Sequence, residues 1–254
     1  MKIVAFSRED AAGSNIAALL LNEFGLDGRQ VIAFDSTMTN ATFPPDFRPE
    51  VCLVASRHRS ESGQPTLTAH VTGNFSTAEL GGRDGELAFA PALYLREAIR
   101  KLLIYGAGSG YSVSLEVTHH GPTSQPFPLL FVEVGSGPDQ WNDLSACRIV
   151  ARVISDLLSS EPERVPVAVG FGGPHYAPNF TAVIEKVAVG HIASKHVIKS
   201  VDEAMLRQMV GKTVPKPDYA LFDWKGLRGE ERGRLTGMLS KLGLDCRRTS
   251  EFKE

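Results

Sequence analysis

Two adjacent histidines, His119 and His120, lie in the segment EVTHHGPT between two apolar runs. Consecutive residues of a strand point to opposite faces, so a strand that continued through the pair would direct only one ring toward a common site. Gly121-Pro122 follows the pair as a turn signal. If the strand ends before the turn, both rings can be presented from a loop, or one ring can act while the other orients it. We therefore expect His119, His120 and the preceding Glu116 to be catalytic.

A second candidate segment, GFGGPHYAPN, places His175 after two glycines, Gly172 and Gly173. Glycine permits a close backbone approach or a positive φ, and the prolines on either side of His175 stiffen the loop. We expect His175 to be catalytic, and the N–H groups around Gly172 and Gly173 to bind substrate and stabilise an oxyanion. The segment lacks the spacing and the lysine of a phosphate-binding P-loop.

Three further histidines and one carboxylate lie outside these two segments. His58 and His70 lie in a polar, glycine-rich stretch over residues 56–85, which predicts a long functional loop that contacts substrate. Glu133 lies within the apolar strand segment LLFVEV and should have a partner, because a buried unpaired charge is costly. His191 has apolar neighbours, and a core role and a functional role fit it equally well.

The side-chain types favour an activated water over a covalent nucleophile. The sequence has no GxSxG segment, and its cysteines lie outside the histidine clusters. Histidines with a carboxylate suit zinc, which lowers the pKa of a bound water and polarises a carbonyl. We predict zinc as the cofactor and His119, His120, His175 and Glu133 as its ligands, from ligand type alone because HExxH is absent.

A possible nucleic-acid surface lies in the segment DWKGLRGEERGRL. Lys225 and Arg228 are three residues apart, with Trp224 nearby for stacking, although Glu230 and Glu231 partly cancel the positive charge. A solvated helix is the simpler interpretation of this segment alone. We nevertheless predict Lys225 and Arg228 as substrate-binding residues.

Composition limits the remaining possibilities. The chain has 254 residues, of which 43% are apolar, which is enough for a large core. We expect a cytoplasmic protein without a membrane segment, because no apolar run is long enough to span a bilayer and the N-terminus lacks a secretory signal. Three scattered cysteines argue against a disulfide framework, and a net charge of −2 argues against non-specific coating of nucleic acid. Oligomeric state cannot be inferred.

Apolar periodicity predicts alternating strands and helices. The expected strands are 2–6, 31–34, 51–56, 111–118, 129–134, 165–171 and 218–224, and the expected helices are 10–25, 91–106, 136–160 and 230–243. This alternation predicts a layered α/β sandwich with a mixed central sheet flanked by helices, in one domain over residues 1–254. Loops that leave the carboxyl ends of such strands line one crevice, where distant histidines can meet.

Several motifs together resemble the archaeal and plant type of D-aminoacyl-tRNA deacylase: ASRHRSESGQPTLTAHVTGNF, EVTHHGPT, LLFVEVGSGPDQW, GFGGPHYAPNF, VGHI and DWKGLRGE. The resemblance implies zinc-dependent hydrolysis of the ester between a D-amino acid and the 3′ end of tRNA. It also implies a fold related to phosphorylase and peptidyl-tRNA hydrolase-like proteins. The histidine motifs of the family fall on His58, His70, His119, His120, His175 and His191, with Glu116 and Glu133 nearby.

The chain departs from the expected family pattern at three points. Residues 35–50 are short and proline-rich where a further strand and helix are expected, Pro174 replaces a glycine, and the segment PNF lacks a basic residue. The main alternative is a metal-dependent hydrolase or phosphorylase-like enzyme that acts on a small acyl or nucleoside substrate. An RNA-binding module without catalysis would favour Arg, Lys and aromatic residues over clustered histidines. For the deacylase, the substrate's terminal ribose hydroxyl is an alternative to a metal-bound water.

Overall fold

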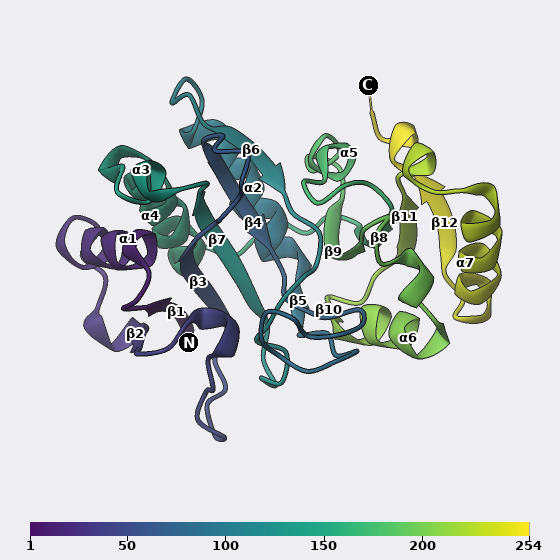
Figure 1. Ribbon diagram of the computed structural model, residues 1–254, viewed down its shortest axis with the longest axis horizontal. Coiled ribbons are helices and arrows are strands. Elements are labelled where there is room, and N and C mark those ends of the chain that lie inside the picture. Colours follow the sequence, from purple (N-terminus) through teal and green to yellow (C-terminus); the bar gives the residue numbers. More distant parts are fainter. Residues whose placement is uncertain (254) are drawn as a thin grey trace.

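The computed structural model describes residues 1–253, and Figure 1 shows its two main sheets side by side. The strands are β1 (Lys2–Ser7), β2 (Val31–Phe34), β3 (Val51–Arg57), β4 (Thr66–His70), β5 (Ala90–Pro91), β6 (Ser112–Leu115), β7 (Leu129–Gly135), β8 (Val167–Phe171), β9 (Ala188–Ala193), β10 (Thr213–Val214), β11 (Tyr219–Phe222) and β12 (Asp245–Arg248). The α-helices are α1 (Ala11–Asn22), α2 (Ala92–Tyr105), α3 (Pro138–Trp141), α4 (Leu144–Ser159), α5 (Pro178–Thr181), α6 (Glu203–Lys212) and α7 (Gly229–Lys241).

The first sheet is mixed, and the second is parallel. The first has the order β2-β1-β3-β7-β4-β6, in which β4 pairs antiparallel with β7 and parallel with β6. The second has the order β12-β11-β8-β9, and the short strands β10 and β5 form a separate parallel pair. The predicted α/β fold with a mixed sheet flanked by helices is confirmed.

Strand β7 shows why the two faces of the first sheet differ. Leu130, Val132 and Val134 share a core with residues of the helices α1, α2 and α4, whereas Phe131 belongs to a separate cluster. Because side chains alternate along a strand, Glu133 lies on the same face as Phe131, away from these helices. The helix-free face is therefore the one that receives the polar side chains.

Helix α2 packs against both sheets, since it contacts β4 in the first and β9 in the second. Its buried Arg96 donates to the backbone oxygens of Ile184 (2.9 Å) and Glu185 (2.8 Å), just before β9 begins. Apolar side chains of α2, including Leu95 and Ile99, belong to a core that contains residues of both sheets. The helix therefore couples the two sheets.

Two sequence-based predictions of secondary structure were wrong. The loop predicted over residues 56–85 contains the buried strand β4, because the backbone of Thr66–His70 pairs with β7 on one side and with β6 on the other. The helix predicted over residues 136–160 is divided into α3 and α4, since Asp143 caps α4 by accepting from the N–H groups of Ser145 and Ala146. The sequence analysis also did not identify β9, β12 and α6.

The proline-rich segment over residues 35–50 packs against the first sheet. Phe43 packs against Phe34 and Phe127, with ring centroids 5.0 Å apart in both pairs. Thr37 and Thr39, which lie earlier in the segment, face a pocket on the helix-free side of the sheet. Among residues 1–253, no helix is both long enough and apolar enough to cross a membrane.

Candidate active site

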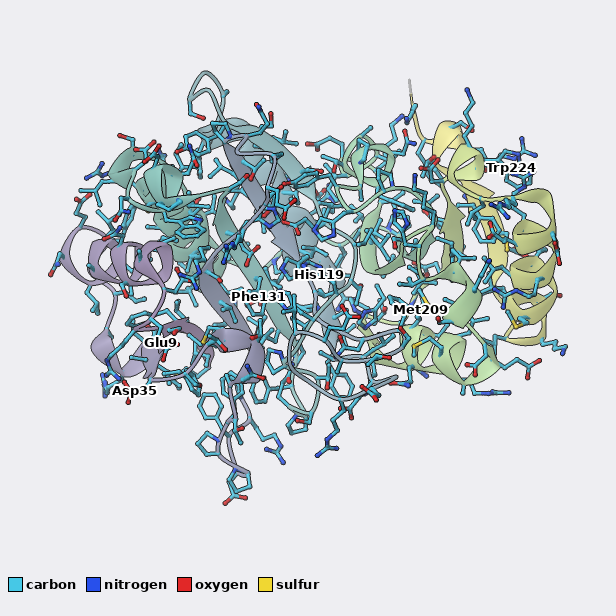
Figure 2. The ribbon with its side chains drawn as sticks, viewed as in Figure 1. Glu9, Asp35, His119, Phe131, Met209 and Trp224 are labelled. Atoms are coloured by element: carbon cyan, nitrogen blue, oxygen red, sulfur yellow. The ribbon has the colours of Figure 1, made fainter. Side chains whose placement is uncertain are left out.

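A pocket of about 350 Å³ lies where the carboxyl ends of several strands meet. It receives side chains from the segments after β1, β3, β6 and β8, and from β7 itself. The predicted site residues that line it are His58, His119, His120, Glu133 and His175. Figure 2 shows His119 near the centre of the molecule and Phe131 close by. Strand ends that are distant in sequence thus meet at one point, as predicted.

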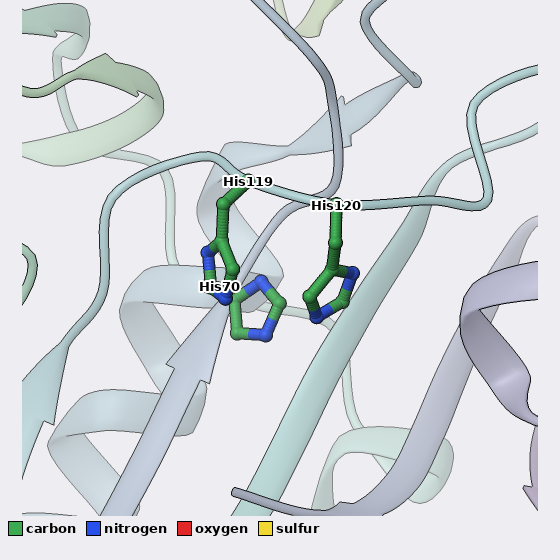
Figure 3. Close-up of side chains that lie close together, drawn as sticks. All are labelled: His70, His119 and His120. Carbon is green, nitrogen blue, oxygen red and sulfur yellow. The ribbon is translucent and has the colours of Figure 1, made fainter. Parts of the chain in front are cut away.

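Both adjacent histidines point toward His70, which ends strand β4 (Figure 3). The ring centroid of His70 lies 4.2 Å from that of His119 and 4.8 Å from that of His120. This is possible because His120 has a φ of 42°, in the left-handed region, so the two side chains do not alternate as they would on a strand. The loop therefore presents both rings to one site.

The backbone determines which ring nitrogen is free in each histidine. His119 Nδ1 lies 2.8 Å from the Val117 oxygen, and His120 Nδ1 lies 2.7 Å from the Gly121 oxygen. A carbonyl oxygen can only accept, so Nδ1 carries the proton in both rings and Nε2 keeps a lone pair in the neutral form. His70 uses its Nδ1 in the same way, 3.3 Å from the Val71 oxygen.

Burial and mutual repulsion keep His119 and His120 neutral. Burial lowers the pKa of both rings, and the nearby positive charge of His70 lowers it further, to about 4 for His120. Burial also acts to lower the pKa of His70, but the Glu133 carboxylate outweighs this effect and raises it. Two neutral imidazoles therefore lie beside a third whose charge depends on Glu133.

The three histidines form a group suited to a metal ion. Their ligand atoms lie within 4.8 Å of one another. His70 Nε2 is buried and has no hydrogen-bond partner among the described residues, which is costly unless a further group binds there. Three imidazole nitrogens with an open fourth position are typical of catalytic zinc. The residues present therefore fit a metal ion.

The four ligands predicted from the sequence do not form a single group. His119 and His120 belong with His70, which was predicted to bind substrate. His175 belongs to a second group with His58 and Glu116, and Glu133 to a third with His70 and Glu116. The tertiary structure thus divides the predicted set among three overlapping groups.

Glu116 lies at the centre of the second group and is fully buried. Its Oε2 accepts a hydrogen bond from His175 Nε2 at 2.7 Å, and its Oε1 lies 3.0 Å from His58 Nδ1. Burial acts to raise the pKa of Glu116, but His175 and His58 hold it well below the usual value. The carboxylate is therefore ionised and shielded, while the side chain of His175 is 47% exposed and reaches the pocket.

His58 lies between two carboxylates. Its Nδ1 is 3.0 Å from Glu116 and 3.5 Å from Glu133 Oε2, and its Nε2 is 2.8 Å from the Tyr176 hydroxyl. Burial acts to lower the pKa of His58, but the two carboxylates raise it to about 11. Glu133 also lies 3.6 Å from His70 Nε2, so the prediction that it has a partner is confirmed, and the partners are imidazoles.

Gly172 and Gly173 do not line the pocket among the residues described. The Gly172 N–H donates to the Ala193 oxygen at 2.8 Å, so it is not available to an oxyanion and that part of the prediction was wrong. Gly173 has a φ of 81°, and a Cβ added there would lie 3.2 Å from Asp223 Oδ2. The two glycines allow the loop to pass close to Asp223 and so position His175.

The predicted basic residues lie elsewhere. Lys225 and Arg228 line a separate depression at the carboxyl ends of the second sheet. The ring of Trp224 is covered by the guanidinium groups of Arg232 and Arg248, whose Cζ atoms lie 4.4 Å and 3.8 Å from its centroid. The indole is therefore already engaged by cations, and the predicted base stacking at this position is disfavoured.

His191 is a core histidine. It is fully buried, donates from Nε2 to the Ala88 oxygen at 2.9 Å, and accepts at Nδ1 from the Thr118 hydroxyl at 3.2 Å. Burial lowers its pKa to about 3, so the ring is neutral. The Thr118 hydroxyl in turn accepts from the Ile192 N–H at 3.0 Å. The core interpretation is confirmed, and His191 ties the segment before His119 to β9.

Sequence reasoning did not identify several residues that line or support the pocket. Asp10 caps α1 by accepting from the Gly13 N–H at 3.0 Å, and it also accepts from the Arg57 N–H at 2.8 Å. Tyr176 contacts His58. The capping position before α1 was a usable signal for Asp10, whereas nothing local linked Tyr176 to a residue 118 positions earlier.

Comparisons with known proteins agree with these observations. The family model described as D-aminoacyl-tRNA deacylase matches residues 46–247. A D-aminoacyl-tRNA deacylase from Methanosarcina acetivorans is 42% identical over 210 residues, which cover 81% of this chain and 69% of the relative. One from Thermococcus kodakarensis is 33% identical over 270 residues, which cover 96% and 98% of the two chains.

A solved structure supports the fold. The crystal structure of the conserved protein of unknown function AF0625 superposes with a TM-score of 0.90 at 27% sequence identity, over 100% of this chain and 96% of that one. The family match covers most of the chain and includes the histidine and glutamate motifs that converge on the pocket. The chain therefore belongs to the D-aminoacyl-tRNA deacylase family.

Proposed function

We propose that this protein hydrolyses the ester bond of D-aminoacyl-tRNA in the pocket where the histidines converge. The main support is that His70, His119 and His120 converge beside the Glu116–His175 pair. This arrangement combines metal-binding nitrogens with a proton acceptor. Membership of the deacylase family supports the same reaction and substrate. The products are the free D-amino acid and tRNA.

Zinc is the proposed metal, and His70, His119 and His120 would hold it through Nε2. Three imidazole nitrogens are a donor set that zinc prefers, and the backbone hydrogen bonds at Nδ1 orient the rings of His119 and His120. When bound, zinc lowers the pKa of a coordinated water to about 7 and polarises a carbonyl.

His175 is the proposed general base. Its Nε2–H donates to Glu116, so in the neutral ring Nδ1 keeps a lone pair that can accept a proton from the attacking water. Glu116 is a positioning residue, because it is shielded from the pocket and acts by orienting His175. His58 contributes a positive charge at the pocket wall, which favours the negative charge that develops on the ester oxygen.

The test is release of D-tyrosine and L-tyrosine from charged tRNA by metal-free protein and after zinc is added. We expect D-selective release that zinc restores, and we expect His119→Ala to lose both bound zinc and activity. D-selective release without any metal dependence would contradict the zinc proposal and move catalysis to His175 or to the ribose hydroxyl of the substrate. No release from either tRNA would contradict the proposed function and favour a small acyl or nucleoside substrate.

A further inference from the structure

Basic side chains gather in a groove at one edge of the second sheet. Its lining includes three lysines, an arginine and a histidine, and we call it the cationic groove: Lys195, His196, Lys199, Lys225 and Arg228. Glu231 is the only carboxylate among the described lining residues, and it accepts a hydrogen bond from the Arg228 N–H at 2.8 Å. That carboxylate is thus engaged in capping α7, and the groove keeps a net positive charge.

The lysines of the cationic groove are not neutralised by neighbours. Among residues 1–253, Lys195, Lys199 and Lys225 make no side-chain ion pair or hydrogen bond. Arg234, which lies beside Lys199 at one end of the groove, donates to the backbone oxygens of Val201 and Ile198 and so keeps its charge. Glu230 and Glu231 line the same end, but among residues 1–253 the exposed lysines form no ion pair with them and are available to an anionic partner.

The topology of the second sheet explains why these residues meet. Strands β8, β9 and β11 are parallel neighbours, so their carboxyl ends lie along one edge. Lys195 follows β9, and Lys225 follows β11. The crevice outside the carboxyl ends of parallel strands is the usual ligand-binding position of such sheets.

A backbone hydrogen bond connects the cationic groove to the loop that carries His175 into the active-site pocket. The Lys195 N–H donates to the Gly173 oxygen at 3.0 Å. Gly173 is two residues before His175, and two residues of extended chain span at most about 7 Å. Figure 2 shows Trp224, the neighbour of Lys225, among the C-terminal elements and His119 near the middle of the molecule. The segment after β9 that carries Lys195 is therefore bonded directly to the loop that carries His175.

We propose that the cationic groove binds the phosphates of the tRNA nucleotides that lead into the esterified 3′ end, an inference that rests on the proposed function. An ester placed in the pocket requires the rest of the tRNA strand to leave it, and the groove offers an adjoining path with complementary charge. Trp224 is covered by arginines, so the contacts are to the backbone rather than to stacked bases. Backbone contacts carry no sequence information, which suits an enzyme that acts on many tRNAs.

The experiment compares the wild type with the triple variant Lys195→Ala, Lys199→Ala and Lys225→Ala on two substrates. For D-tyrosyl-tRNA we expect KM to rise by roughly 10- to 100-fold with little change in kcat, and the dependence of log(kcat/KM) on log salt to become shallower by about one per lysine removed. For the 3′-D-tyrosyl ester of adenosine, which has no phosphate, kinetics should not change.

Lys216→Ala is the matched control. Lys216 is exposed and precedes β11, so it lies at the opposite edge of the same sheet. Its replacement removes one positive charge, as each of the three groove substitutions does, and should leave KM and the salt dependence at their wild-type values. All four substitutions replace exposed side chains that form no hydrogen bond or ion pair within residues 1–253, so we expect the variants to fold.

The outcomes distinguish a failure of the groove inference from a failure of the proposed function. If the wild type releases D-tyrosine from tRNA and the triple variant has the same KM and salt dependence, the inference is overturned and the proposed function stands. If the wild type releases nothing, the proposed function fails, and fluorescence anisotropy with uncharged tRNA still tests the groove. In that measurement an equal Kd for wild type and triple variant overturns the inference, whereas weaker binding by the variant supports it.

Discussion

At the scale of single residues, hydrogen bonds assign different roles to histidines of the same type. His119 and His120 donate from Nδ1 to the backbone and so present Nε2. His175 donates from Nε2 to Glu116 and so presents Nδ1. His191 uses both nitrogens within the core. Which ring nitrogen is hydrogen-bonded therefore distinguishes the proposed metal ligands from the proposed base and from the structural histidine.

Glu116→Gln tests the positioning role of this carboxylate. The change keeps the shape of the side chain and removes the charge that orients His175, so we expect kcat to fall by about 10- to 100-fold while KM changes little. Steady-state kinetics with D-tyrosyl-tRNA measure the two constants separately. The melting temperature of the variant is the control for folding, and a folded variant with wild-type kcat would contradict the role.

At the scale of elements, the segment over residues 116–120 is held from two sides. On one side Thr118 bonds to His191 and to the Ile192 N–H of β9. On the other side the Gly73 N–H donates to the His120 oxygen at 2.8 Å. A Cβ added at Gly121 would lie 2.3 Å from the Gly82 nitrogen, so glycine is required where the two loops meet. The left-handed conformation of His120 is thus imposed by its surroundings.

His191 should make the stability of the protein depend on pH. Its pKa is about 3 in the folded state and near 6.5 when unfolded, so the unfolded state binds the extra proton and stability falls as pH drops through 6.5 toward 3. Between pH 7.5 and pH 5 this group alone should cost about 2 kcal/mol. Urea unfolding of His191→Gln at both pH values should show a smaller difference than the wild type.

The exposed His196 provides the matched control for this measurement. His196→Gln removes an imidazole that is exposed to solvent, and its urea midpoints should follow those of the wild type at both pH values. Equal pH dependence in His191→Gln and in the wild type would show that His191 does not contribute the expected proton linkage.

At the scale of the whole molecule, α2 joins the mixed sheet to the parallel sheet. We propose on this basis that residues 1–254 fold as one cooperative domain rather than as two units. The buried Arg96 makes a polar link between them, because its guanidinium satisfies two backbone oxygens just before β9. The active-site pocket also depends on both sheets, since His175 follows β8 and His119 follows β6.

Arg96→Met tests this cooperativity. Loss of the guanidinium leaves two backbone oxygens without partners, which we expect to destabilise the protein by about 3 kcal/mol. In differential scanning calorimetry a single transition should remain and shift down by roughly 6 to 12 °C. Arg100→Met is the control, because Arg100 lies one turn further along α2 and pairs with the exposed Glu185 side chain, so its loss should cost less than about 1 kcal/mol. Two separate transitions would contradict the single domain.

The sequence by itself determined the order of most strands and helices and the positions of the chemically active segments. Periodicity of two or 3.6 residues is a local pattern, so β7 and α2 could be predicted from their own residues. The cost of burying a charge is also local, which is why Glu133 could be expected to have a partner. The histidine motifs beside glycine and proline predicted the region of the site for the same reason.

Only the tertiary structure decided how these segments combine. The strand that carries His70 was interpreted as loop because its polar side chains face Glu133 across the sheet, a partner 63 residues away. The grouping of ligands depends on the insertion of β4 between β7 and β6, and the cationic groove on the adjacency of β9, β8 and β11. Strand order is set by long-range pairing and burial across the whole molecule, and no local pattern specifies it.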